Sequence, residues 1–122
     1  MQVVVVEPKK KPVVQNIDPG MESMQKIVGG SIEAVYPFAD PVALICNEEG
    51  KLLGLPLNRA LRDDEGNVYD IISGTFFLCA APPDSEHFES LTDQQVKTYM
   101  ERFAMPEMFI NVGGDLFVLP YL

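Results

Sequence analysis

Residues 41–62, PVALICNEEGKLLGLPLNRALR, form the stretch around which the rest of the chain is organised. The apolar run at residues 42–46 is typical of a buried strand. The sequence NEEG at residues 47–50 then predicts a turn, in which the asparagine bonds to its own backbone and Gly50 supplies a positive φ. No other part of the sequence combines apolar scaffold, turn chemistry and ionisable side chains so densely.

Beyond this turn we expect the chain to continue extended as far as residue 57, because Gly54 and Pro56 exclude a regular helix. Residues 58–61 are expected to form a short loop or a single helical turn. The acidic sequence at residues 63–67 is typical of the connection in a hairpin.

Further strands are expected on both sides of this stretch. Runs of β-branched and alternating apolar residues predict them at residues 2–7, 13–17, 31–38, 68–72 and 75–80, with a final hairpin at residues 108–119. The unbroken apolar run at residues 2–7 indicates burial on both faces, so we place this strand at the centre of the sheet.

Two helices are predicted, and each begins at a capping signal. Asp18, followed by proline, suits the start of the first helix, and Gly29 suits its end. Thr92 and Gln95 have the spacing of a capping box at the start of the second helix, residues 93–103.

These elements together predict the fold class. The length of 122 residues suits one domain, residues 1–122, and the hydrophobic share of 47% is sufficient for a core. We predict an α+β fold, with a mixed, mainly antiparallel sheet of about five to seven strands and two helices packed on it.

Composition excludes several classes of partner. The 18 acidic residues against 9 basic ones give a net charge of −9, which opposes direct nucleic-acid binding and binding to an anionic membrane surface. No apolar run approaches the ~20 residues of a membrane span, and no signal peptide pattern is present. Cys46 and Cys79 lie in apolar runs, as buried free thiols do, so we expect a reducing, cytoplasmic location.

The usual motifs of catalysis are missing from the sequence. The chain has one histidine, His87, in a polar connector, so a multi-histidine metal site is excluded. It has no CxxC pair, no GxxxxGK[ST] and no GxGxxG, so the common zinc, redox and phosphate-cradling loops are excluded as well.

The most plausible binding surface lies on the turns of the opening stretch. Arginine recognises phosphate and carboxylate groups, and asparagine offers both a donor and an acceptor. In the structural alternative, Arg59 pairs with Glu48 or Glu49. The candidate ligand- or partner-binding residues, at one end of the sheet, are Asn47, Glu48, Glu49, Lys51, Asn58, Arg59 and Arg62.

Two other functions stay open. The carboxylates of Glu48, Glu49, Asp63 and Asp64 are candidates for a metal-dependent enzyme, since two or three converging carboxylates suit Mg²⁺ or acid–base chemistry. Alternatively, the chain is a structural, oligomerising module, for which the apolar segment at residues 116–122 is suited.

Four motifs of the chain resemble a known family. The family is domain of unknown function 3846, which occurs in phages, prophages, conjugative elements and their bacterial hosts. The resemblance spans about residues 3–80, and Ser31 departs from the bulkier residue common at its position. The motifs are VGGSIE at residues 28–33, NEEGK at 47–51, GLPLNRA at 54–60 and DIISG at 70–74.

This resemblance implies an accessory protein of a mobile element, and it supplies no reaction. We therefore expect a non-enzymatic binding protein without a cofactor, with a role in countering host defence. Its expected partner is a small anionic ligand such as a nucleotide, or a host protein.

Overall fold

The apolar run at residues 42–46 forms β4 (Val42–Asn47), an interior strand of a five-stranded sheet in the computed structural model, which describes residues 1–122. The sheet order is β2-β1-β7-β4-β3, and every pairing in it is antiparallel. The predicted α+β class is therefore confirmed, although the sheet is not mixed. Its other strands are β1 (Gln2–Val6), β2 (Val13–Asn16), β3 (Ile32–Val35) and β7 (Phe76–Ala80).

The central strand is β7, whereas the sequence predicted β1. Every residue of β7 is buried, and the strand lies between β1 and β4. β1 lies one place away, between β2 and β7. The prediction was wrong because both strands carry a continuous apolar run, and such a run does not distinguish the centre of a sheet from the position beside it.

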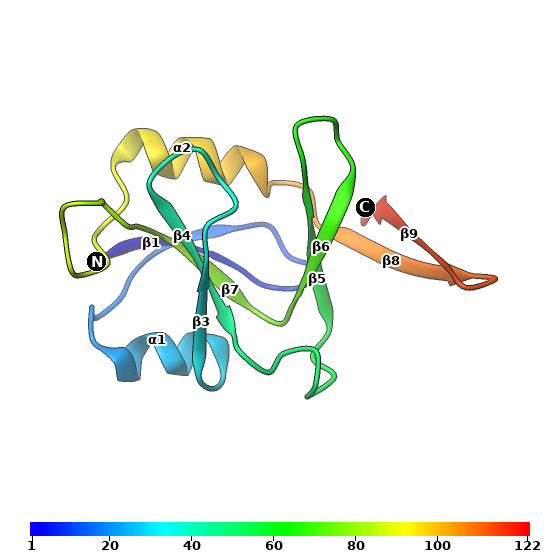
Figure 1. Ribbon diagram of the computed structural model, residues 1–122, viewed down its shortest axis with the longest axis horizontal. Helices are drawn as coiled ribbons and strands as arrows, with labels where there is room; N and C mark the ends of the chain where they lie inside the picture. The colour runs from blue at the N-terminus through cyan, green and yellow to red at the C-terminus, as the bar shows by residue number, and fades with distance from the viewer.

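One helix covers each face of this sheet, as Figure 1 shows. Side chains alternate between the two faces of a strand, so neighbouring valines of β1 enter different cores. Val3 and Val5 pack with α1 (Met21–Val28), whereas Val4 and Val6 pack with α2 (Asp93–Arg102). Because both faces are covered, the interior strands carry continuous apolar runs.

The sequence predicted some of the helix ends correctly. Thr92 and Gln95 form the predicted capping box of α2, and Gly29 ends α1 in the left-handed conformation. The first cap was predicted wrongly, because α1 begins after Gly20 and not after Asp18. Backbone hydrogen bonds between Met1 and Ile17 hold the chain extended beyond β2, which delays the start of the helix. Neither helix is long and apolar enough to span a membrane.

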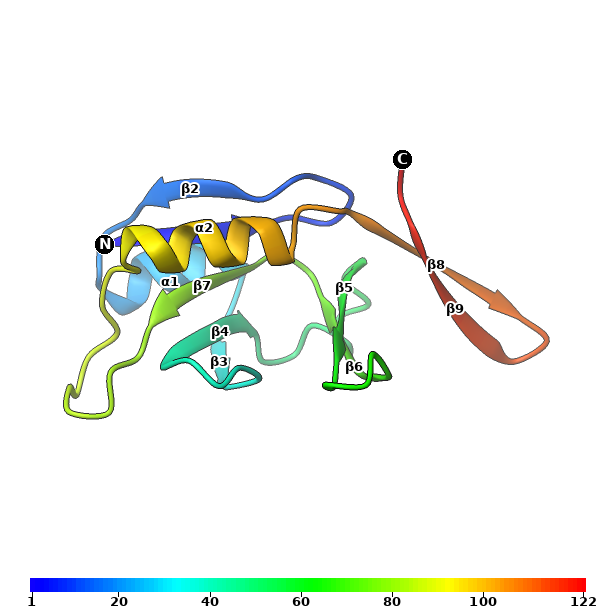
Figure 2. The ribbon, with the colours of Figure 1, turned by 90° about the horizontal axis from the view of Figure 1, so that it is seen from above.

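Two hairpins lie beside the main sheet, as Figures 1 and 2 show. The first pairs β5 (Leu57–Arg62) with β6 (Val68–Ser73), and the second pairs β8 (Glu107–Val112) with β9 (Asp115–Pro120). The prediction of a loop or helical turn at residues 58–61 was wrong, because these residues pair with β6 and are buried.

Gly50 is required by a close approach of two backbone segments. It is absent from the glycines with positive φ, contrary to the prediction. A Cβ at this position would lie 2.8 Å from the carbonyl oxygen of Ser73, at the end of β6. The turn that follows β4 therefore rests directly on the first hairpin, and only glycine leaves enough space.

Replacing Gly50 with alanine should lower the free energy of unfolding by about 2 kcal/mol, because one of the two backbone segments must move. Gly20→Ala is the matched control, since a Cβ there meets no atom within 4 Å. Urea unfolding followed by circular dichroism measures both variants. Equal midpoints for the two variants would contradict the close approach.

Candidate functional site

Strand β5 buries two of the polar residues that the sequence singled out. Asn58 is 0% exposed and Arg59 is 1% exposed. Asn58 donates from Nδ2 to the carbonyl oxygens of Val6 and Gly74, at 2.8 Å each. This amide therefore joins β5 to the main sheet, and both of its donor bonds are used inside the fold.

Arg59 is bound by backbone carbonyl groups from distant parts of the chain. Its Nη2 donates to the oxygens of Lys10 at 2.7 Å and Phe103 at 3.0 Å, and its Nη1 donates to Oδ1 of Asn58 at 3.0 Å. Burial lowers the pKa of the guanidinium, and the charge of Glu107 counteracts this. The expected pairing of Arg59 with Glu48 or Glu49 is wrong, because neither carboxylate forms a salt bridge.

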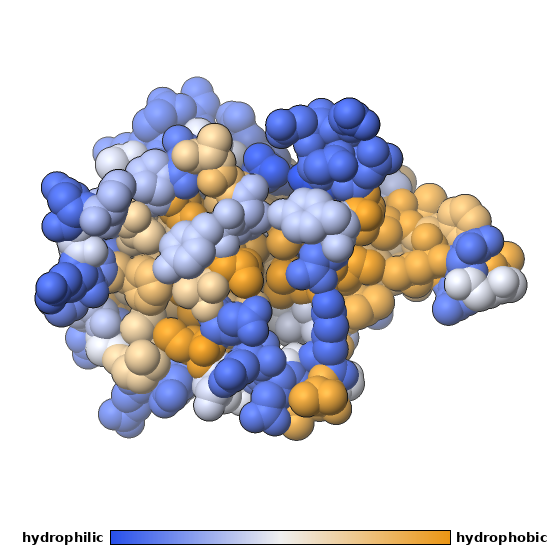
Figure 3. All heavy atoms as spheres, in the orientation of Figure 1, coloured by the Kyte–Doolittle hydropathy of each residue, from blue (hydrophilic) through white to orange (hydrophobic).

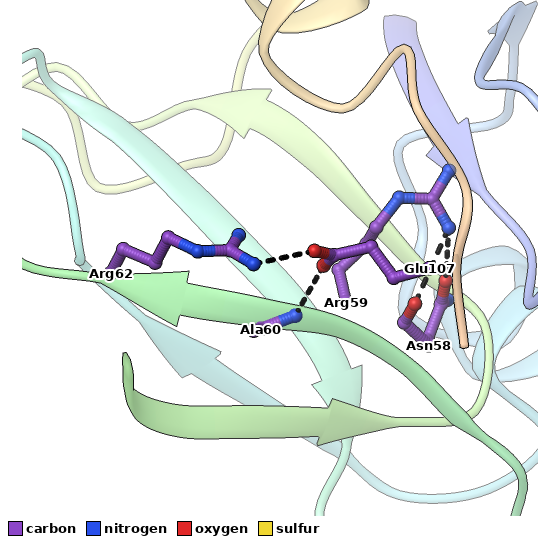
Figure 4. A network of polar contacts seen from close by, with 5 residues as sticks. All are labelled: Asn58, Arg59, Ala60, Arg62 and Glu107. Carbon is purple, nitrogen blue, oxygen red and sulfur yellow. Dashed lines mark hydrogen bonds and ion pairs between the residues drawn. The ribbon is translucent and has the colours of Figure 1, made fainter. Parts of the chain in front are cut away.

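Glu107, the first residue of β8, connects the second hairpin to β5 (Figure 4). Its Oε1 accepts a hydrogen bond from the backbone N–H of Ala60 at 2.8 Å, and its Oε2 lies 2.6 Å from Nη2 of Arg62. Figure 4 shows the carboxylate between Arg62 and the strand, with the guanidinium of Arg59 directed the other way. Both carboxylate oxygens are thus engaged.

A cavity of about 300 Å³ lies at this junction, and we call it the arginine pocket. The chain contains three arginines, and all of them border this pocket. Against these three positive charges it has one carboxylate. The lining residues are Arg59, Ala60, Leu61, Arg62, Arg102, Phe103, Met105 and Glu107.

Arg102 and Arg62 are the two guanidinium groups that a ligand in the pocket can reach, since both side chains are exposed. Arg102 ends α2 and lies over the ring of Phe38, at 4.8 Å from the ring centroid, with no carboxylate partner. Arg59 forms the buried wall, and its Nε is the one buried side-chain nitrogen without a hydrogen-bond partner.

The candidate residues of the turn lie around a different cavity, of about 230 Å³, which we call the turn pocket. Asn47, Glu48 and Lys51 border it, but no residue borders both pockets. Asn47 is buried and donates to the carbonyl oxygen of Val28, while Lys51 pairs with Asp70 at 2.7 Å. Glu49 is exposed and borders neither pocket. The seven candidate residues therefore do not form one surface.

The carboxylates proposed for metal chemistry also do not converge. No group of three or more His, Cys, Asp or Glu side chains is placed to hold a metal ion. Oδ1 of Asp63 accepts from the backbone N–H groups of Glu65 and Asn67, as turn residues commonly do. His87 is exposed, as the sequence predicted.

Sequence reasoning missed Arg102 and Glu107. Their roles depend on contacts between β5 and segments more than 40 residues away, such as the 45-residue separation of Arg62 from Glu107. Neither residue lies in a recognisable motif. A possible signal was the small number of arginines in an acidic chain, because arginine suits the recognition of anions better than lysine does.

Replacing Arg59 with methionine should lower the free energy of unfolding by about 3 kcal/mol, because it removes the donor to the buried carbonyl group of Phe103 and to the partly buried one of Lys10. The matched control is Arg102→Met, an exposed arginine of the same pocket, with an expected loss below about 1 kcal/mol. Chemical denaturation measures both. Similar losses for the two variants would contradict the structural role of Arg59.

The cysteines are unsuited to nucleophilic chemistry. Burial, followed by the charges of Glu33 and Asp70, raises the pKa of the Cys46 thiol to about 11, with Lys51 opposing this shift. Burial raises the pKa of Cys79 to about 12. Both thiols are free and buried, as the sequence predicted.

At about pH 8 the native chain should therefore react only slowly with a colorimetric thiol reagent, because the reactive thiolate is suppressed. In urea both cysteines should react at once. Rapid labelling of the native chain would contradict this assignment.

The raised thiol pKa of Cys46 also predicts how stability depends on pH. Between the ordinary thiol pKa of 9.0 and about 11, the free energy of unfolding should fall as the pH rises, since the unfolded chain ionises first.

Comparison with known proteins places the chain in a family. The comparisons with curated proteins and with solved structures gave no match. A family model described as "Domain of unknown function (DUF3846)" matches residues 1–104, which extends beyond the motifs noted in the sequence and ends before β8. The chain belongs to the DUF3846 family.

Proposed function

We propose that the chain is a non-enzymatic binding protein, and that it holds a small anionic ligand in the arginine pocket. The observation that carries this proposal is the gathering of all three arginines around one cavity in a chain of net charge −9. The net charge of the whole chain opposes the approach of an anion. A local excess of positive charge therefore has a specific purpose, and attraction of an anion is the simplest one.

The accessible arginines define the chemistry of the ligand. A guanidinium group offers paired N–H donors in a plane, which match the oxygens of a phosphate or a carboxylate. Arg102 has no carboxylate partner, so its donors remain available. Arg62 is already oriented by Glu107 at 2.6 Å. An anion between Arg62 and Arg102 would contact one free and one oriented guanidinium.

The size of the cavity supports a small ligand. At about 300 Å³ the arginine pocket lies at the lower end of the ~300–1,000 Å³ range of small-molecule sites. The apolar lining from Leu61, Phe103 and Met105 would contact an uncharged part of such a ligand. A nucleotide or a smaller phosphate or carboxylate compound has both features.

The same pocket favours binding over turnover. Its one carboxylate, Glu107, uses both oxygens in contacts with Ala60 and Arg62, so no free general base borders the cavity. For an accessory protein of a mobile element, sequestration of an anionic signal molecule is a counter-defence role that needs no catalysis. The two free, buried cysteines support a reducing, cytoplasmic location.

Isothermal titration calorimetry with inorganic phosphate, adenosine monophosphate and uncharged adenosine tests this proposal. We expect the monophosphate to bind and adenosine to bind more weakly. Arg102→Ala should weaken binding of the monophosphate by about tenfold or more, because it removes a charged hydrogen-bond donor.

The matched control is Lys97→Ala, which removes one positive charge from an exposed position of α2 that does not border the pocket. This variant should bind the monophosphate with the affinity of the unaltered chain. The proposal fails if neither phosphate compound binds, or if the two variants weaken binding equally.

A further inference from the structure

The arginine pocket carries an excess of positive charge that the chain itself does not compensate. Three guanidinium groups against the one carboxylate of Glu107 leave an excess of two positive charges around the cavity. Glu107 pairs with Arg62 at 2.6 Å, and no other arginine of the chain forms a salt bridge. The excess therefore belongs to Arg59 and Arg102.

The charge of Arg59 is the more unusual of the two, because water does not reach it. Its side chain is 1% exposed, and it donates to the oxygens of Lys10, Phe103 and Asn58. All of these oxygens belong to uncharged carbonyl or amide groups, so the bonds satisfy donors without neutralising the charge. Such a buried charge costs free energy, and it acts strongly on a ligand in the cavity beside it.

The acidic turn of the first hairpin does not supply the missing negative charge. This turn, residues 63–67, forms the tip of the hairpin, where Figure 3 shows a hydrophilic surface. None of its residues borders the arginine pocket. Asp63, which follows Arg62, accepts hydrogen bonds within its own turn, from the backbone N–H groups of Glu65 and Asn67. Compensation of the two charges is therefore left to a ligand.

The size of the cavity indicates that both negative charges of this ligand lie on one group. About 300 Å³ is at the lower end of the range of small-molecule sites, which leaves little room for two separate anionic groups. A carboxylate has only two oxygens to share between Arg62 on β5 and Arg102 on α2. A phosphate monoester has three terminal oxygens and a charge of about −2 near pH 7.5.

We infer, on the basis of the proposed function, that the ligand of the arginine pocket is a phosphate monoester in its doubly charged form. One negative charge compensates Arg102 by direct contact. The other compensates the buried Arg59 through the wall of the pocket, while Arg62 donates to the ligand and stays paired with Glu107. Phosphate diesters and monocarboxylates, which carry a single charge, leave one of the two arginines uncompensated.

Isothermal titration calorimetry of the full chain with adenosine monophosphate and with its phosphate methyl ester tests this assignment. The methyl ester keeps the base and the sugar but carries one negative charge at every pH used. At about pH 7.5 the monophosphate should bind about tenfold more tightly, because it brings the second charge.

The same pair of ligands at about pH 5 separates the effect of charge from that of the added methyl group. The second phosphate pKa is about 6, so most of the monophosphate is singly charged at this pH. The two affinities should then differ by less than about threefold, since only about a tenth of the monophosphate is still doubly charged. A steric effect of the methyl group would be the same at both pH values.

A matched pair of variants at Met105 tests the charge balance of the pocket itself. Met105 borders the cavity and is 50% exposed, so the fold tolerates a polar side chain there. Met105→Glu adds one carboxylate and should reduce the preference for the monophosphate to about threefold or less, because it compensates one positive charge. Met105→Gln has the same length without the charge and should keep the preference, whatever its effect on the affinity itself.

Three results would overturn the assignment: equal binding of the two ligands at about pH 7.5, a preference that persists unchanged at about pH 5, or the same preference in both Met105 variants. In each of these cases an anion still binds, so the proposed function stands. If neither the monophosphate nor its methyl ester binds, the proposed function and the assignment of its ligand fail together.

Discussion

The buried guanidinium of Arg59 is the interaction on which the arrangement of the hairpins depends. β5 and β6 form a separate two-stranded sheet, so no backbone ladder fixes them to the main sheet. Side chains of β5 supply the missing connections instead. Burying a charged group costs free energy unless its hydrogen-bond donors are satisfied. The planar guanidinium of arginine can donate to several oxygens at once, which meets this condition. The carbonyl groups that Asn58 and Arg59 reach belong to Val6, Lys10, Gly74 and Phe103.

The same interaction positions the arginine pocket. Because Arg59 donates to the carbonyl oxygen of Phe103, it holds the C-terminal end of α2 against β5. Arg102 precedes Phe103 in the chain, and Arg62 lies on the strand that carries Arg59. A structural contact thereby brings two exposed guanidinium groups to one cavity. Arg59 therefore has a structural role, whereas Arg62 and Arg102 are available to bind a ligand.

Sequence reasoning succeeded where structure follows from local chemistry. The capping box of α2, the glycine that ends α1 and the apolar strands depend on neighbours within a few residues. It failed at residues 58–61, because Asn58 and Arg59 interrupt the apolar pattern of a buried strand. Their hydrogen bonds span as many as 52 residues, which no local pattern encodes. Gly50 was explained by the wrong cause for the same reason, since the atom that excludes a side chain there belongs to Ser73.

Glu107 connects the arginine pocket to the second hairpin. It is the first residue of β8, three residues beyond the end of the family match, and it is also the partner of Arg62. Because one of its oxygens accepts from the backbone N–H of Ala60, the carboxylate of Glu107 is fixed against β5, and its other oxygen holds the guanidinium of Arg62. Glu107 thereby orients one of the two guanidinium groups that the proposed ligand would contact. An arginine inside the family match is thus positioned by a residue that lies beyond the match.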